Sequence, residues 1–250
     1  MGTGFVLFAD ERLVAIDKPA GVSLATRRRE PGAAVERLLA AIPESERTAC
    51  DLEARRLWLV HRLDVGTTGL VLLARDPETH RELVRSFAER RVEKRYLALV
   101  WGRPRPRQGS FEWPLGPDLR DRRRMRVDPA GRQAASAYLV LAHRQPASLV
   151  ELVPATGRTH QLRVHLAHAG HPIVGDDLYG GPRHRGVRDA ALRQALQPWH
   201  PLLHAWRLRL SAPGGGELEL AAPLPAELIT ALQALGLPAP AGLELPDWRA

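Results

Sequence analysis

The sequence contains only one cysteine, Cys50, among its 250 residues. One thiol cannot close a disulfide within the chain, so the composition indicates a reducing compartment and predicts a cytoplasmic protein. No stretch approaches the roughly 20 apolar residues that a membrane-spanning helix needs. The apolar run Phe5–Ala9 is too short for a secretory signal and lacks its basic flank. We therefore expect a protein that is neither secreted nor inserted into a membrane.

Motifs for nucleotide cofactors are also missing. There is no Gly-x4-Gly-Lys-Ser/Thr phosphate loop, no Gly-x-Gly-x-x-Gly fingerprint and no Cys-x-x-Cys pair. Four histidines do lie close together in the chain. On a helix, however, His160 and His165 point about 140° apart, and no cysteine or second carboxylate follows at a chelating spacing. We predict neither a cofactor nor a metal site, and we expect local hydrogen bonds from these four histidines: His160, His165, His168 and His171.

What the chain does have is positive charge. The formal net charge is +8, with a sequence pI near 10.7, and arginine supplies most of it. Such a balance favours a polyanionic partner through counterion release, although arginines scattered over a solvated surface are the alternative. Two clusters favour basic loops that grip the phosphates of a polyanion over a cleft, with partly neutralised loops as the alternative. The first is Arg103, Arg105 and Arg107, and the second is Arg120, Arg122, Arg123, Arg124, Arg126 and Arg132.

The hydrophobic pattern predicts one domain over residues 1–236, followed by a Pro-rich tail over 237–250. Several strands, few helices and no strict βαβ rhythm indicate an α/β fold of the α+β type, with a mixed or mostly antiparallel sheet. The predicted strands cover 12–16, 69–74, 96–101, 110–115, 124–127, 134–141, 149–153, 204–210 and 217–221. The predicted helices cover 31–42, 77–90, 160–169, 189–197 and 225–235, with Asp76 and Thr159 as N-caps of the second and third. The predicted buried stripe of the second helix consists of Leu83, Val84 and Phe87.

The most informative stretch is His61–Gly69, with the sequence HRLDVGTTG. It carries one carboxylate, Asp64, just before an apolar run, so we expect Asp64 at the mouth of a buried strand, facing a cleft. Two further segments accompany it: Lys94–Tyr96, which opens a predicted strand, and Thr156–Arg163, with the sequence TGRTHQLR.

Together these segments resemble the RluA-type RNA pseudouridine synthases. Asp17–Gly21 is similar to the N-terminal signature of that family, and the likeness extends from about residue 9 to residue 236. The resemblance implies the pseudouridine synthase fold, in which helices flank a central catalytic cleft on a long, bent sheet. Because the signature begins by residue 10, we expect no N-terminal RNA-binding module of the S4 type.

The resemblance also implies roles for four residues. Asp64 matches the catalytic aspartate, as nucleophile, as base for a sugar proton or as an electrostatic stabiliser. Arg163 matches the arginine that pairs with it, Tyr96 the active-site tyrosine and Arg62 the arginine that helps to extrude the base. Ordinary structural roles are the alternatives: a turn aspartate, a surface arginine, a core tyrosine and a salt-bridging arginine.

The predicted function is therefore isomerisation of a specific uridine to pseudouridine in a tRNA or rRNA stem-loop, by a monomer. Two other functions stay open. A catalytically silent RNA-binding protein would keep the fold, and it predicts erosion at Asp64, Tyr96 or Arg163, which the sequence does not show. A hydrolytic N-glycosidase would use Asp64 to release free uracil.

Overall fold

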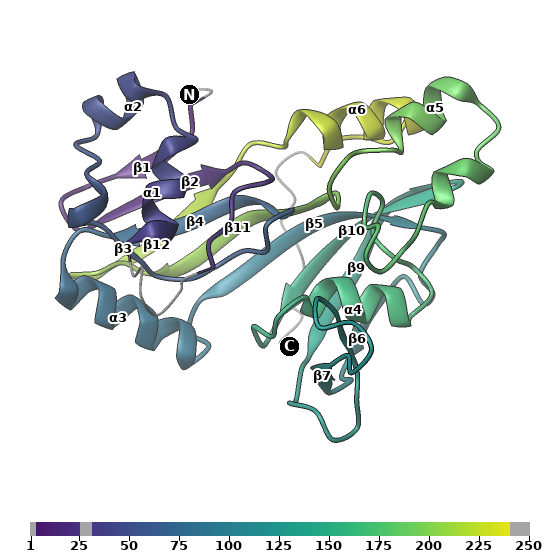
Figure 1. Ribbon diagram of the computed structural model, residues 1–250, viewed down its shortest axis with the longest axis horizontal. Coiled ribbons are helices and arrows are strands. Elements are labelled where there is room, and N and C mark those ends of the chain that lie inside the picture. Colours follow the sequence, from purple (N-terminus) through teal and green to yellow (C-terminus); the bar gives the residue numbers. More distant parts are fainter. Residues whose placement is uncertain (1–3, 26–31, 241–250) are drawn as a thin grey trace.

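A ten-stranded sheet runs through the molecule and carries helices on both faces (Figure 1). The computed structural model describes residues 4–25 and 32–240. The strands of the sheet are β1 (Val6–Ala9), β2 (Leu13–Lys18), β3 (Trp58–Leu59), β4 (Thr68–Ala74), β5 (Glu93–Trp101), β6 (Gln108–Phe111), β9 (Ser136–Arg144), β10 (Ala147–Pro154), β11 (Leu203–Ser211) and β12 (Glu217–Ala221). A separate hairpin is formed by β7 (Leu115–Pro117) and β8 (Met125–Val127).

The strand order is β1-β2-β4-β11-β5-β10-β9-β6, with β3 beside β4 and β12 beside β11. Within the described residues every pairing is antiparallel except the one between β4 and β11. The helices are α1 (Ala33–Ala40), α2 (Glu44–Ala49), α3 (Pro77–Ala88), α4 (Gln161–His168), α5 (Ala190–Ala195) and α6 (Ala226–Leu235). The expected fold class, a largely antiparallel sheet with flanking helices, is confirmed.

Burial on both faces explains why the central strands are continuous apolar runs. All seven residues of β4 are buried, and they alternate between two clusters on opposite faces. On β11, Leu203 and Ala205 point to the same face because they are two residues apart. Leu203 packs with α4 and Ala205 packs with α1. Tyr96 contacts both clusters, so it lies where the two halves of this face meet.

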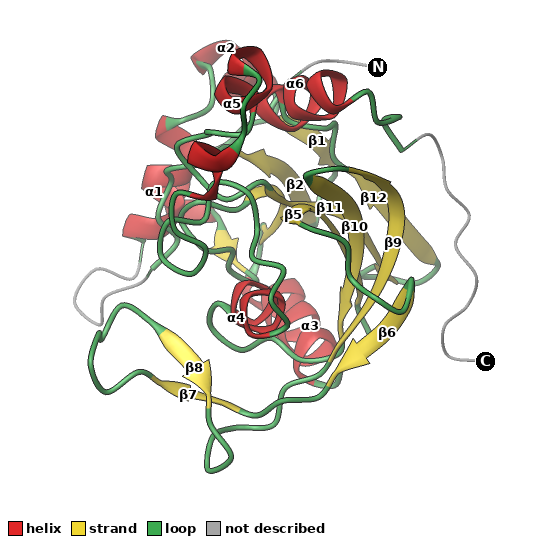
Figure 2. Cartoon of the chain, turned by 90° about the vertical axis from the view of Figure 1, so that its right-hand side faces the viewer, coloured by secondary structure: helices red, strands yellow, loops and turns green. Residues whose placement is uncertain are grey.

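Several predicted elements have different limits in the structure. The expected strand 110–115 is divided into β6 and β7, because Pro114 cannot donate to a sheet ladder and the chain leaves the main sheet there. Figure 2 shows the resulting β7–β8 hairpin apart from the sheet, beyond α4. The short elements β1 and α2 were not predicted. On α3, the predicted cap Asp76 is confirmed, since its side chain accepts hydrogen bonds from the amides of Glu78 and Thr79.

Two further details of the helix predictions are wrong. Val84 is 38% exposed, because the buried stripe of α3 follows Thr79, Leu83 and Ser86, and residue 84 is turned about 100° away from Leu83. Thr159 does not cap α4. His160 occupies the N-cap position instead, in a left-handed conformation with φ 55°.

Leu237, at the start of the predicted tail, packs against the core beside α6. From residue 241 onward the tail lies outside the described residues, as does the run of three arginines at 27–29. Across the described ranges the structure has no helix of the length and apolarity that crossing a bilayer demands.

Candidate active site

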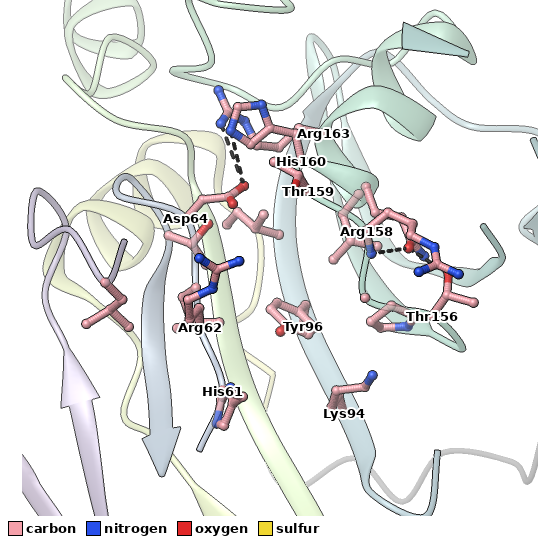
Figure 3. A pocket seen from close by; sticks show the side chains of 18 of the residues that line it. His61, Arg62, Asp64, Lys94, Tyr96, Thr156, Arg158, Thr159, His160 and Arg163 are labelled. Carbon is pink, nitrogen blue, oxygen red and sulfur yellow. Dashed lines mark hydrogen bonds and ion pairs between the residues drawn. The ribbon is translucent and has the colours of Figure 1, made fainter. Parts of the chain in front are cut away.

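A cleft of about 680 Å³ opens on the face of the sheet that α1 and α4 share. That volume is within the range of small-molecule sites and exceeds the volume of one nucleotide base. One wall is the loop between β3 and β4, and the other is the loop leading into α4 (Figure 3). The floor comes from β5. The lining includes His61, Arg62, Asp64, Lys94, Tyr96, Thr156, Arg158, Thr159, His160 and Arg163.

Asp64 lies in the turn that enters β4, as the sequence predicts for the mouth of a buried strand. Its carboxylate is 26% exposed and therefore accessible from the cleft. A buried lysine fixes the turn: Lys18 Nζ donates to the carbonyls of Pro19, Val22 and Val65, at 2.7, 3.2 and 3.2 Å. The N-terminal signature thus holds the main chain directly after Asp64.

Burial has an electrostatic cost for this lysine. Loss of hydration lowers the pKa of Lys18 from 10.5 to about 8, and the nearby Asp64 carboxylate opposes that shift. Lys18 is completely buried, with an exposed fraction of 0%.

Arg163 faces Asp64 from the opposite wall, but Asp64 is not its main partner. Arg163 Nε and Nη2 donate to the two carboxylate oxygens of Asp176, at 2.7 and 2.8 Å. The remaining nitrogen, Nη1, lies 3.7 Å from Asp64 Oδ2. Both members of the Arg163–Asp176 pair are nearly buried, with side chains 10% and 1% exposed. Asp176 therefore orients the guanidinium, and Asp64 receives its free edge (Figure 3).

The loop before α4 is held by one glutamine. Gln161 Oε1 accepts from the Thr156 hydroxyl at 2.7 Å and from the Arg158 amide at 3.0 Å. Its Nε2 donates to the Ala135 carbonyl and the Ser136 hydroxyl, both at 2.8 Å. Threonine and glutamine in the TGRTHQLR segment thus shape the wall that carries Arg163.

Tyr96 lies on β5 between the two walls (Figure 3). Burial and the neighbouring Asp64 charge raise the pKa of Tyr96, so its phenol stays protonated at neutral pH. On the same face of β5 lies Lys94, whose pKa is lowered by burial and by the charge of Arg90. Arg62 is exposed and lies beside Asp64, with its guanidinium in the cleft.

The structure thus brings together all four residues singled out from the sequence. It adds some that sequence reasoning did not identify: Lys18 and Asp176, which fix the two walls, and Lys94. Lys18 and Lys94 stand in segments already noted, whereas only the fold reveals that Asp176 reaches Arg163 from 13 residues away.

The two arginine clusters do not lie where the sequence suggested. Among the described residues, the arginines of 103–107 and 120–132 do not line the cleft. Several have local partners instead: Arg123 pairs with Asp121 at 2.8 Å and Arg126 pairs with Asp128 at 3.1 Å. The later cluster belongs to the β7–β8 hairpin, which packs on α4. These arginines border the Arg163 wall rather than the cleft itself.

Three of the four histidines make the expected local hydrogen bonds, whereas His168 packs edge-on against Trp113. The described residues contain no cluster of three or more potential metal ligands. His160 Nδ1 contacts the Tyr179 hydroxyl at 2.8 Å, and His165 Nε2 contacts the Trp113 carbonyl at 3.0 Å. His171 Nδ1 lies 3.0 Å from the Trp101 carbonyl.

The chain is similar to known proteins over most of its length. Residues 12–168 match the family model described as RNA pseudouridylate synthase. An uncharacterised RNA pseudouridine synthase of Chloroflexus aurantiacus is 43% identical over 221 residues, which are 88% of this chain and 65% of that protein. The ribosomal large subunit pseudouridine synthase D of Nitrosomonas europaea is 36% identical, over 92% of this chain and 64% of its own length. The chain thus spans just under two thirds of each relative.

Two solved structures have a similar fold. The human RNA pseudouridylate synthase domain containing 4 superimposes with a TM-score of 0.70 and 28% identity, over 94% of both chains. The human domain containing 1 superimposes with a TM-score of 0.69 and 25% identity. The resemblance predicted from the three motifs is confirmed, and the chain belongs to the RNA pseudouridylate synthase family.

Proposed function

We propose that the chain isomerises uridine to pseudouridine in RNA, with Asp64 as the catalytic carboxylate. The observation that carries the proposal is the accessible Asp64 carboxylate in a cleft, 3.7 Å from the guanidinium of Arg163 and opposite Tyr96. The reaction breaks the N1–C1′ bond, turns the uracil and joins C5 to C1′. The C5 proton leaves and N1 gains one, so atoms and charge balance without an added reactant.

Each residue has a task in that reaction. Positive charge develops at C1′ as the glycosidic bond opens, and the Asp64 carboxylate stabilises it or adds to it. Arg163 and Lys18 place positive charge beside that carboxylate. The ring of Tyr96 offers the extruded uracil a stacking surface worth about 1–3 kcal/mol. Arg62, exposed beside Asp64, fills the gap that the base leaves in the RNA stack.

The RNA substrate is a finer proposal. The positive net charge of +8 suits a polyanion, and the Nitrosomonas relative is named for the ribosomal large subunit. We therefore propose a stem-loop of large-subunit rRNA as the first substrate to test, with a tRNA stem-loop second. A monomer in the cytoplasm stays a prediction from the sequence.

A tritium-release assay tests the proposal. RNA carrying tritium at C5 of uracil is incubated with the protein, and release is measured together with free uracil and chain integrity. Isomerisation expels the C5 tritium, keeps the base and leaves the chain intact. A hydrolytic N-glycosidase releases labelled uracil instead. RNA binding without release on total RNA would identify a silent binding protein and overturn the proposal.

A further inference from the structure

His160 has an unusual backbone conformation at the edge of the cleft. Its φ of 55° lies in the left-handed region, which a residue with a Cβ adopts rarely and at a cost. Strain of this kind is retained where the surroundings enforce it, often at functional sites. The conformation directs the ring between Tyr179 on one side, with Nδ1 2.8 Å from Oη, and Asp64 on the other, with Nε2 4.0 Å from Oδ2.

The hydrogen bonds of Tyr179 determine which nitrogen of His160 carries the proton. The backbone amide of Met125 donates to Tyr179 Oη at 2.8 Å, and an amide can only donate. The phenol hydrogen is therefore free for its other neighbour, His160 Nδ1. The reverse arrangement, with a proton on Nδ1, leaves the phenol hydrogen without an acceptor among its described contacts. Because Nδ1 accepts, a neutral ring carries its proton on Nε2, which faces Asp64.

The groups around the ring favour its neutral form. Burial lowers the pKa of His160 first of all; the Asp64 and Asp176 carboxylates oppose that shift, and Arg163 supports it. Tyr179 is held as well, because its ring lies between the guanidinium groups of Arg124 and Arg163, at 5.3 and 5.0 Å. Burial raises the pKa of Tyr179, which keeps the phenol a donor.

We propose that His160 is a positioning residue that presents an Nε2–H donor to the Asp64 carboxylate, and that Tyr179, fixed by the β7–β8 hairpin, holds the ring in that tautomer. The 4.0 Å separation exceeds a hydrogen bond, and such contacts commonly tighten when substrate closes the site. The proposal rests on the proposed function of Asp64. It also links the arginine-rich hairpin to the catalytic carboxylate through Met125 and Tyr179.

The tautomer can be measured without any turnover. Nitrogen-15 NMR of the histidine rings distinguishes Nε2–H from Nδ1–H, and the His160 signals are identified by their loss in His160→Gln. At pH 7.5 the wild-type ring should be the Nε2–H form, and Tyr179→Phe should convert it to a mixture. Tyr138→Phe, which removes a hydroxyl that donates to the Pro106 carbonyl elsewhere, should leave the ring unchanged. A wild-type Nδ1–H ring, or identical ratios in wild type and Tyr179→Phe, overturns the proposal.

Kinetic measurements then test whether turnover depends on the N–H donor of His160 or only on the shape of its side chain. Glutamine and methionine have similar lengths, but only glutamine offers an N–H near the Nε2 position. A hydrogen bond to a charged group is worth about 1.5–3 kcal/mol, so His160→Met should lower kcat about 10- to 100-fold. His160→Gln should stay within about threefold of wild type, and KM should change little in both. If both variants unfold at the wild-type temperature and lose kcat equally, the donor role of His160 is contradicted. If wild type itself releases no tritium, the proposed function fails, and the NMR result still stands.

Discussion

The two walls of the cleft are fixed by different kinds of interaction. The Asp64 wall depends on main-chain carbonyls gathered around one buried ammonium, that of Lys18. The Arg163 wall depends on side chains: a buried ion pair with Asp176, and a tyrosine that binds His160. This difference supports the proposal that Asp64 serves chemistry, while Asp176 orients the guanidinium that contacts both carboxylates. Asp64, the more accessible of the two carboxylates, makes the longer contact with the Arg163 guanidinium.

The largest expected effect is the loss of activity when the Asp64 carboxylate is replaced. Asp64→Asn removes the charge that reacts at C1′ but keeps the shape, so turnover should fall by at least about a thousandfold, as for other reacting groups. RNA binding, measured by filter retention, should persist. Asp177→Asn is the matched control, because that neighbour of Asp176 is exposed and should retain full turnover. Turnover by Asp64→Asn at the wild-type rate would remove Asp64 from its role.

The free energy of unfolding should depend more on Asp176 than on Asp64, which is the reverse of the order expected for activity. Asp176→Asn leaves a nearly buried guanidinium without its carboxylate, which should lower the free energy of unfolding by about 3 kcal/mol in urea titrations. Glu217→Gln breaks a similarly bidentate pair with Arg209 on the surface, where water screens the charges, and it should lower that free energy much less. Similar losses in both variants would mean that the buried pair does not anchor its wall.

The wall around Lys18 should respond to alkaline pH. Its pKa is about 8 in the folded protein and 10.5 when hydrated, so the unfolded chain holds more protons between those values. Stability therefore rises with pH across that window, and the penalty is complete below pH 8. From pH 7 to pH 10 the wild type should gain about 2 kcal/mol relative to Lys18→Met. The background from other amines is small, since Lys94 is the only other lysine. Parallel curves for the two proteins would contradict a depressed pKa.

The smallest effect concerns the hairpin beside the Arg163 wall. Arg122→Ala removes one exposed charge there and should weaken RNA binding about two- to threefold. If that charge contacts a phosphate, the log–log salt slope should fall by about 0.7. Arg209→Ala removes an exposed charge that Glu217 already neutralises, and it should leave the slope unchanged. Equal slopes in both variants would exclude the hairpin from RNA contact.

Much of this arrangement could be predicted from the sequence because its signals are local. The cap at Asp76 and the all-apolar run of β4 specify an element start and a buried strand, and both are confirmed. The resemblance supplied the four residues that meet in the cleft. The order of the strands could not be predicted in this way, and neither could the pairing of Arg163 mainly with Asp176 in place of Asp64. Both depend on contacts between distant segments, and no periodicity reports that Asp176 takes two nitrogens of Arg163.

The left-handed His160 illustrates a similar limit. Local preference indicated Thr159 as the cap of α4, since threonine is a good N-cap and histidine is not. Contacts with Tyr179 and with Asp64 overrode that preference. On α3 the predicted stripe is correct at Leu83 and wrong at Val84, which is exposed.

The insertion of β11 between β4 and β5 has a consequence for biosynthesis. Residues 203–211 separate strands that are made more than a hundred residues earlier, and β4 pairs with them through Thr68 and Gly69. During translation the Asp64 segment and the Tyr96 segment leave the ribosome long before the strand that joins them. The cleft is therefore joined only after residues 203–211 have been made, and a nascent chain stopped before residue 203 has both halves but no joined cleft.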